Sequence, residues 1–190
     1  MKFKFLIAAL IAASAGSAMA ATDNYNIDPR HTFPSFEADH MGLSIWRGKF
    51  DKTSGTVSLD RAAKTGSLDI VIDANSIDFG LDALSAHARK AEMFNVEKFP
   101  NVTYKSKSFK FNGDKLVAVE GELTLLGVTK PVTLTVNHFN CIMHPQLKRE
   151  VCGADASAEF KRTDFGLNFG VPKFSPDVKL AIQVEAIKAD

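Results

Sequence analysis

Alternating apolar and polar residues along much of the chain predict β-strands. In 132–137, valine or leucine alternates with threonine or asparagine. A period of two places successive side chains on opposite faces of a strand, so this segment has one buried and one solvated face. Similar patterns predict strands over 67–73, 102–111, 115–126 and 180–184.

Two of these strands carry finer predictions. In 115–126, we expect Val117, Val119, Leu123 and Leu125 to share one face. In 102–111, the apolar face switches between Tyr104 and Phe109, which predicts a β-bulge there.

Turn-forming residues separate the predicted strands. Gly, Asn, Asp and Pro cluster at 53–55, 63–66, 112–114 and 126–131. The pattern gives about eight strands, spaced as in a β-sandwich or a barrel. Eight strands can close a small barrel with room for one ligand.

One segment departs from the β pattern. Residues 81–94 are rich in alanine and contain no β-branched residue, and Leu81, Leu84 and Ala88 fall on one helical face. This predicts a single helix of two to three turns, followed by Pro100.

The first twenty residues have the layout of a Sec signal peptide. Lys2 and Lys4 precede an apolar stretch over 5–13 that is too short to span a bilayer, and Ala18-Met-Ala20 is typical of a cleavage site. We therefore expect one mature domain over 21–190 in the periplasm, with secretion as the alternative. Because no other long apolar run follows, we expect it not to span a membrane.

Charge excludes one large class of partner. The formal net charge of the whole chain is +1, and removal of Lys2 and Lys4 leaves 21 basic residues against 22 acidic ones, a net −1. The charges are interspersed rather than gathered on a basic face, so nucleic acid is not an expected partner.

The two cysteines predict a disulfide. Cys141 and Cys152 reach an oxidising compartment if the chain is exported, and cysteines there usually pair. The alternative is a metal site built from His138, Cys141, His144 and Cys152, although their spacing is not that of a structural zinc site. We therefore predict no metal site.

No catalytic motif is present. The chain lacks G-x-S-x-G, H-E-x-x-H, a P-loop and G-x-G-x-x-G, which favours a binding protein over an enzyme. Thirteen phenylalanines follow residue 20, with one Trp and two Tyr. Phe adds apolar surface without a polar group, as suits the wall of a cavity for a hydrocarbon chain. The alternative is an ordinary apolar core, which composition alone favours.

Five blocks resemble a known family in the same order. They are Asp28-Pro-Arg-His-Thr32 with Phe36 and His40-Met-Gly42, Arg47-Gly-Lys-Phe50, His87-Ala-Arg89 through Phe94 to Phe99-Pro-Asn-Val102, Gly121-Glu-Leu-Thr-Leu-Leu-Gly-Val-Thr-Lys-Pro-Val132, and Arg162-Thr-Asp-Phe-Gly166. Together they resemble the YceI family of lipocalin-like, polyisoprenoid-binding periplasmic proteins. The resemblance covers nearly all of the mature chain. It implies an all-β, eight-stranded antiparallel lipocalin-like barrel with one short helix near an opening, a long hydrophobic cavity, and a homodimer.

Seven residues in or beside these blocks are candidate ligand contacts. They are Phe36, His40, Arg89, Phe94, Phe160, Arg162 and Phe165. The apolar members would contact a chain, and His40 and the arginines would contact a polar head group. Phe79 and Phe139, in contrast, are expected to be ordinary core residues.

Each polar candidate also has a purely structural alternative. His40 could instead bond to backbone in a turn near Gly42. Arg89 could pair with Glu92, and Arg162 could pair with Asp164 to lock the end of a strand.

The leading hypothesis is non-enzymatic binding, transport or storage of a long-chain amphiphilic lipid. The expected ligand is a polyisoprenoid, an isoprenoid quinone or a fatty-acid derivative, with no other cofactor. The alternative is a metal- or stress-related periplasmic protein.

Overall fold

Eleven strands and one α-helix make up most of the computed structural model, which describes residues 22–190. The predicted signal peptide lies outside the described residues. The strands are β1 (Asp23–Ile27), β2 (Phe33–His40), β3 (Ser44–Phe50), β4 (Thr53–Asp60), β5 (Thr65–Asp73), β6 (Ile77–Asp78), β7 (Asn101–Asn112), β8 (Lys115–Leu125), β9 (Val128–Met143), β10 (Glu150–Lys161) and β11 (Asp177–Lys188).

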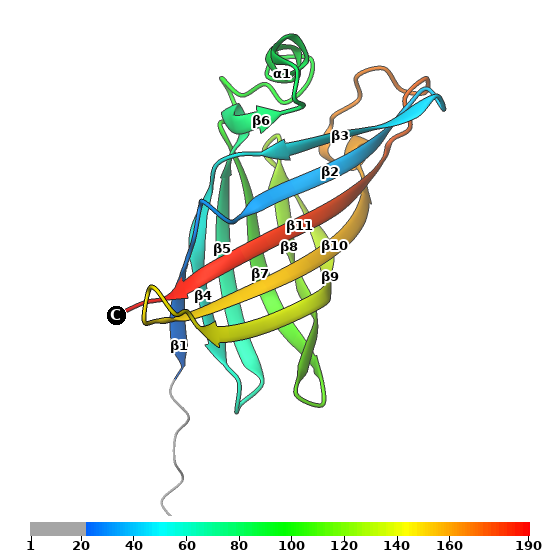
Figure 1. The fold of residues 1–190 in the computed structure, drawn as a ribbon. Helices are drawn as coiled ribbons and strands as arrows, with labels where there is room; N and C mark the ends of the chain where they lie inside the picture. The colour runs from blue at the N-terminus through cyan, green and yellow to red at the C-terminus, as the bar shows by residue number, and fades with distance from the viewer. Residues whose placement is uncertain (1–21) are drawn as a thin grey trace, which may run out of the picture.

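Eight antiparallel strands form a closed barrel. The order is β1-β4-β5-β7-β8-β9-β10-β11, and pairing of β1 with β11 closes the circle. Farther along β11, β2 takes the place of β1, and β2 pairs with β3. The β2–β3 hairpin therefore extends the barrel wall beyond the ends of β1 and β4 (Figure 1). The predicted eight-stranded antiparallel barrel is confirmed.

A short break divides β1 from β2. Pro29 lies in this break, and two neighbours anchor it to β11: Asp28 N donates to Glu185 O at 2.9 Å, and Thr32 Oγ1 donates to the same oxygen at 3.2 Å. Glu185 N donates back to Thr32 Oγ1 at 3.1 Å. Because both halves stay bonded to β11, the wall changes direction here without opening.

The predicted bulge in β7 is confirmed. The register with β8 shifts between Ser106 and Ser108, so Tyr104 and Phe109 both reach the barrel interior. A second register shift shows that the predicted face of β8 is wrong at Val117. Phe111 pairs with Leu116 and Lys110 with Ala118, which leaves Val117 as the extra residue. Leu116 is buried in its place, and Val117 is exposed.

The predicted helix is α1 (Asp82–Ala88), which spans two turns and ends where Arg89 caps it. Figure 1 places α1 at one end of the barrel, and the turn between β9 and β10 at the other, beside the C-terminus. A 3₁₀ helix over Arg162–Phe165 follows β10 and ends at Gly166, whose φ of 85° suits glycine.

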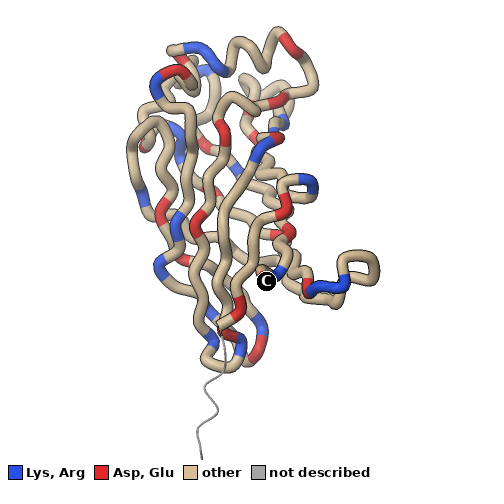
Figure 2. Tube along the Cα trace, turned by 90° about the vertical axis from the view of Figure 1, so that its left-hand side faces the viewer, with Lys and Arg blue, Asp and Glu red and all other residues tan. Residues whose placement is uncertain are grey.

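Charged side chains lie mainly on the outside of the barrel. Figure 2 shows basic and acidic residues interspersed along the strands, without a large patch of one sign. Among residues 22–190, no helix is both long and apolar enough to cross a membrane.

Candidate ligand cavity

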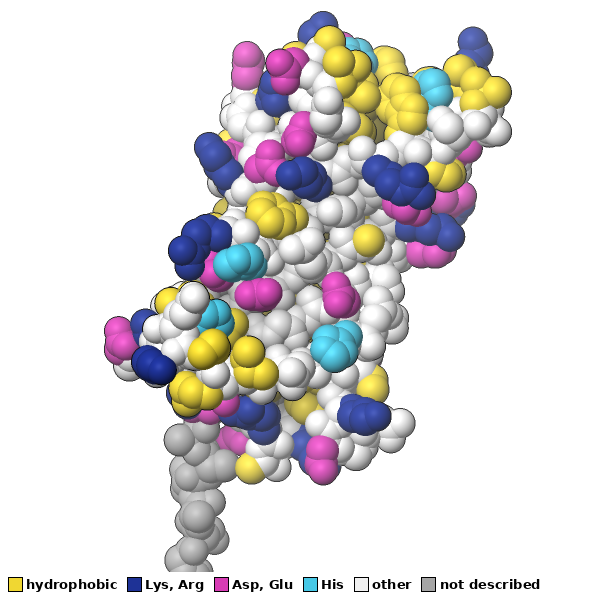
Figure 3. Space-filling model, in the orientation of Figure 1, with side chains coloured by type: hydrophobic (Ala, Val, Ile, Leu, Met, Phe, Trp, Pro, Cys, Tyr) yellow, Lys and Arg dark blue, Asp and Glu magenta, His cyan; other side chains and the backbone are white. Residues whose placement is uncertain are grey.

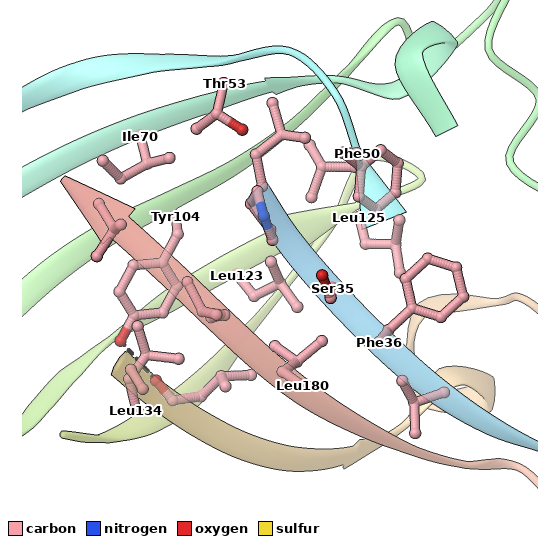
Figure 4. Close-up of a pocket in the computed structure, with 18 of the residues that line it drawn as sticks. Ser35, Phe36, Phe50, Thr53, Ile70, Tyr104, Leu123, Leu125, Leu134 and Leu180 are labelled. Carbon is pink, nitrogen blue, oxygen red and sulfur yellow. Dashed lines mark hydrogen bonds between the residues drawn. The ribbon is translucent and has the colours of Figure 1, made fainter. Parts of the chain in front are cut away.

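The barrel encloses a cavity of about 390 Å³. Its lining is almost wholly apolar, as is usual for small-molecule sites. Side chains from every strand of the closed barrel contribute, and Figure 4 shows part of this wall, including Ile70, Leu123, Leu134 and Leu180. Alternation within each strand puts these residues inside and their polar neighbours outside.

The two ends of the cavity differ in exposure. At one end the lining residues are buried, among them Tyr25, Leu59 and Cys152. At the other end, the lining includes Phe169, which is 40% exposed, and His87, whose side chain is 34% exposed. This second end, beside α1, is therefore the mouth of the cavity.

Apolar side chains surround the mouth on its outer side. They lie on the β2–β3 hairpin, at the start of α1 and in the segment that follows the 3₁₀ helix: Met41, Leu43, Ile45, Leu81, Phe169 and Val171. Figure 3 shows hydrophobic side chains gathered at this end of the molecule. An apolar ligand approaching the mouth would meet apolar surface before it enters.

Several cavity rings pack closely against glycines on the neighbouring strand. A Cβ added to Gly48 would fall 2.5 Å from the ring of Phe36, and one added to Gly66 would fall 2.5 Å from the ring of Phe109. A Cβ added to Gly121 would likewise fall 2.5 Å from the ring of Tyr104. Because these glycines have no side chain, the rings cover the strand surface and leave the centre of the barrel open.

Among residues 22–190, Arg162 is the one Lys or Arg side chain that lines the cavity, and it is only 8% exposed. Its guanidinium donates to Leu167 O at 2.8 Å, Ser175 O at 3.2 Å and Phe174 O at 3.4 Å. All three acceptors are backbone carbonyls, and no ion pair joins Arg162 to an acid within residues 22–190. Burial lowers the pKa of this guanidinium, as expected for a charge removed from water.

The sequence profile of the YceI-like domain matches residues 25–186. The chain belongs to the YceI-like domain family. Protein YceI of Salmonella arizonae is 34% identical over 185 residues, which cover 97% of this chain and 95% of that protein.

Two solved structures share the fold of this YceI-like chain. Burkholderia cenocepacia BcnA superposes with a TM-score of 0.69 at 21% identity, covering 84% of this chain and 98% of that one. A polyisoprenoid binding domain from Saccharophagus degradans, implicated in plant cell wall breakdown, gives a TM-score of 0.64 at 19% identity, covering 87% and 98%.

Four of the seven candidate residues line the cavity of the YceI-like domain. Phe36, Phe94, Phe160 and Arg162 do so. The alternative pairing of Arg162 with Asp164 does not occur, because the 3₁₀ helix and the segment after it direct backbone carbonyls at the guanidinium instead.

The other three candidates lie outside the lining. His40 stacks on Trp46, with ring centroids 3.9 Å apart, and also approaches Phe174. Arg89 donates to the carbonyls of Asn75 and Ile77, each at 3.4 Å, and so holds the end of α1 to the β5–β6 connection rather than pairing with Glu92. Phe165 is 1% exposed and packs behind Phe160, with ring centroids 5.2 Å apart.

Sequence reasoning missed several lining residues. Phe79 and Phe139, expected in the ordinary core, both line the cavity, as do Trp46, Phe169 and Phe174. Thr53 was also missed, because residues 53–55 were predicted to form a turn, whereas they begin strand β4. A strand pattern alone could have found Trp46, because it lies two residues from Gly48 and four from Phe50 on β3.

Cys141 and Cys152 are joined by a disulfide between directly paired residues of β9 and β10. The bond uses both thiols, so the alternative metal hypothesis has no thiolate to use. Glu150 lies near the disulfide, but it accepts hydrogen bonds from Tyr25 and Arg61.

Proposed function

We propose that this YceI-like domain is a non-enzymatic binding protein that holds the apolar chain of a lipid inside its barrel. The observation that carries the proposal is a deep, apolar cavity, closed at one end, with an unneutralised cation in its wall. Apolar burial at about 25 cal/mol per Å² would drive binding, reduced by the cost of ordering a flexible chain. The structurally similar Saccharophagus degradans domain, described as polyisoprenoid binding, supports the same class of ligand.

We further propose that the head group is anionic and contacts Arg162. A guanidinium has five N–H donors, and three acceptors are present around this one. A phosphate or carboxylate could take the remaining donors and neutralise a buried charge. A polyprenyl phosphate and a fatty acid both fit this chemistry. The predicted signal peptide and the disulfide support the periplasm as the place of action.

Native mass spectrometry of protein purified from its host tests the core of this proposal. We expect a mass above that of the bare chain, which organic extraction returns to the bare value while releasing a lipid. Protein that carries no lipid, and that binds neither a polyprenyl phosphate nor a fatty acid when offered, would contradict the proposal.

The role of Arg162 is tested with two ligands of equal chain length, a polyprenyl phosphate and the corresponding polyprenol. Arg162→Gln should weaken binding of the phosphate by about tenfold or more, the usual loss for a charged hydrogen bond, and change binding of the alcohol little. Arg162→Lys should retain part of the difference. Arg47→Gln is the matched control, because Arg47 pairs with Glu37 on the outer face. Equal losses for both ligands would mean that Arg162 acts only on the fold.

A further inference from the structure

Thr53 combines deep burial with an unused hydroxyl. It is the first residue of β4, and its side chain points into the barrel, on the same face as Val57 and Leu59. Thr53 is 3% exposed, and its Oγ1 has no hydrogen-bond partner. Among residues 22–190, it is the one buried side-chain oxygen or nitrogen in that condition.

The other hydroxyls along the cavity all have partners. Tyr104 donates to Val132 O at 2.8 Å or Val119 O at 3.0 Å. Thr32 bonds to the backbone of Glu185, and Ser35 donates to Phe33 O at 3.4 Å. The fold thus gives these hydroxyls backbone partners, and the lining hydroxyls of Tyr25 and Ser175 donate to the carboxylates of Glu150 and Asp177. Thr53 has neither kind of partner.

On the cavity side of Thr53, the strand neighbours carry no acceptor in their side chains. Ile72 pairs with Thr53 on β5, and Val102 pairs with Ile72 on β7, so the adjacent wall is aliphatic. Figure 4 shows the hydroxyl of Thr53 directed toward the space between Ile70 and Phe50. A buried hydroxyl without a partner destabilises a protein, whereas valine of nearly the same shape would not. A group inside the cavity is therefore the acceptor that the position fits.

We propose that Thr53 is a specificity-determining residue that donates a hydrogen bond to a carbonyl oxygen within the ligand. This inference rests on the proposed lipid-binding function and narrows it to lipids that carry a carbonyl group in the buried part of the molecule. A carbonyl is favoured over a hydroxyl because one donor satisfies it, whereas a buried hydroxyl also needs an acceptor for its own hydrogen.

Thr53 and Arg162 contact different parts of such a ligand. Arg162 follows Phe160 toward the mouth, and its N donates to Pro176 O just before β11. Thr53 follows Phe50 toward the closed end, near the break between β1 and β2. A ligand with an anionic head at Arg162 would therefore place its carbonyl some way along the chain, and the spacing between the two groups would determine which lipids fit best.

A series of octadecanoic acids, each with a single keto group at a different carbon, tests this directly. Affinities of delipidated protein are measured by competition against a fluorescent apolar probe. For the wild type, we expect a maximum at one keto position, roughly threefold to tenfold above its neighbours, as for one neutral hydrogen bond. Thr53→Val should bind all positions alike, and Thr53→Ser, which keeps the hydroxyl, should restore the maximum. Thr56→Val is the matched control, since Thr56 is exposed on the same strand.

The possible failures are distinguishable. A wild-type profile without a maximum, or the same maximum in Thr53→Val, overturns the role of Thr53 while leaving lipid binding intact. If unsubstituted octadecanoic acid and the whole keto series fail to bind the wild type, the proposed function fails, and this inference fails with it. Thermal unfolding of each empty variant checks the fold, and Thr53→Val should be at least as stable as the wild type.

Discussion

Asp28 lies in the break between β1 and β2, and its side chain is only 5% exposed. Its carboxylate accepts from Arg30 N at 3.0 Å and lies 2.9 Å from His31 Nδ1. Burial alone would raise the pKa of Asp28, but the hydrogen bonds from Arg30 and His31 outweigh burial and lower that pKa to about 2. Folding therefore favours the ionised carboxylate.

The lowered pKa of Asp28 makes stability depend on pH in a defined window. The stabilisation that ionised Asp28 provides is complete above pH 3.8, the ordinary pKa of an aspartate side chain. It is lost as the pH falls through about 2. Asp28→Asn should thus lower the free energy of unfolding at neutral pH by about 1–2 kcal/mol. Urea unfolding at several pH values measures this, and the difference from wild type should shrink below pH 3.8. Asp114→Asn, at a side chain 97% exposed, is the control. An undiminished difference near pH 2 would contradict the assignment.

At three places in the barrel wall, an aromatic ring on one strand packs against a glycine on the neighbouring strand. The ring of Tyr104 on β7 lies over Gly121 on β8, so close that its hydroxyl reaches two backbone carbonyls. The same contact is made by Phe36 with Gly48 and by Phe109 with Gly66. The open centre of the cavity therefore depends on three glycines, whose lack of a side chain makes room for the rings.

Gly121→Ala tests this dependence. The new Cβ would lie 2.5 Å from both Tyr104 Cζ and Lys105 O, and backbone cannot easily move away. Overpacking and loss of the Tyr104 hydrogen bonds should together cost about 2–3 kcal/mol of unfolding free energy. Gly153→Ala on β10 is the matched control, because its Cβ would meet no atom closer than 3.5 Å. Equal effects in the two variants, measured by urea unfolding, would show that the ring contact does not matter.

At the level of elements, the sequence predicted most of what depends on local pattern. Alternation predicted the strands and the bulge between Tyr104 and Phe109, because both follow from the period of two. The displaced Val117 was missed, since a second bulge changes the face of every residue beyond it.

The site was harder to predict because side-chain partners come from distant segments. Arg89 was predicted to meet a ligand, but it lies outside the cavity lining, where its Nη1 donates to the carbonyls of Asn75 and Ile77. Phe79 follows the short strand β6, and Phe139 lies in β9 just beyond a register shift with β10 that puts both Val136 and Phe139 in the cavity lining. The unpaired hydroxyl of Thr53 could not be predicted from the sequence, because it depends on which hydrogen-bond acceptors the fold brings within reach, and Thr53 has none.

For the whole molecule, the difference between the two ends of the barrel determines how a ligand could move. The mouth is bordered by α1, the β2–β3 hairpin and the segment after the 3₁₀ helix, which contribute partly exposed side chains. The closed end is held by polar contacts outside the cavity: Glu150 accepts from Tyr25, and from Arg61 at 2.8 Å. The disulfide lies beside this group. Changes at the closed end should therefore alter mainly the free energy of unfolding, and changes at the mouth should alter mainly the rate of ligand exchange.

Removal of the disulfide tests this separation. The bond closes a short loop, with eleven residues of sequence separation, and constrains the unfolded chain. Its loss in Cys141→Ser/Cys152→Ala should lower the free energy of unfolding by about 2–3 kcal/mol, by the loop-entropy estimate. Reduction of the wild type with a thiol reagent should give a similar loss, which controls for the substitutions themselves. The dissociation rate of a bound lipid, measured at a temperature where both proteins are folded, should change less than about twofold, because the proposed route of release is the mouth at the other end of the barrel. A much faster release from the variant would mean that the disulfide end also opens, and that a ligand can leave through either end of the barrel.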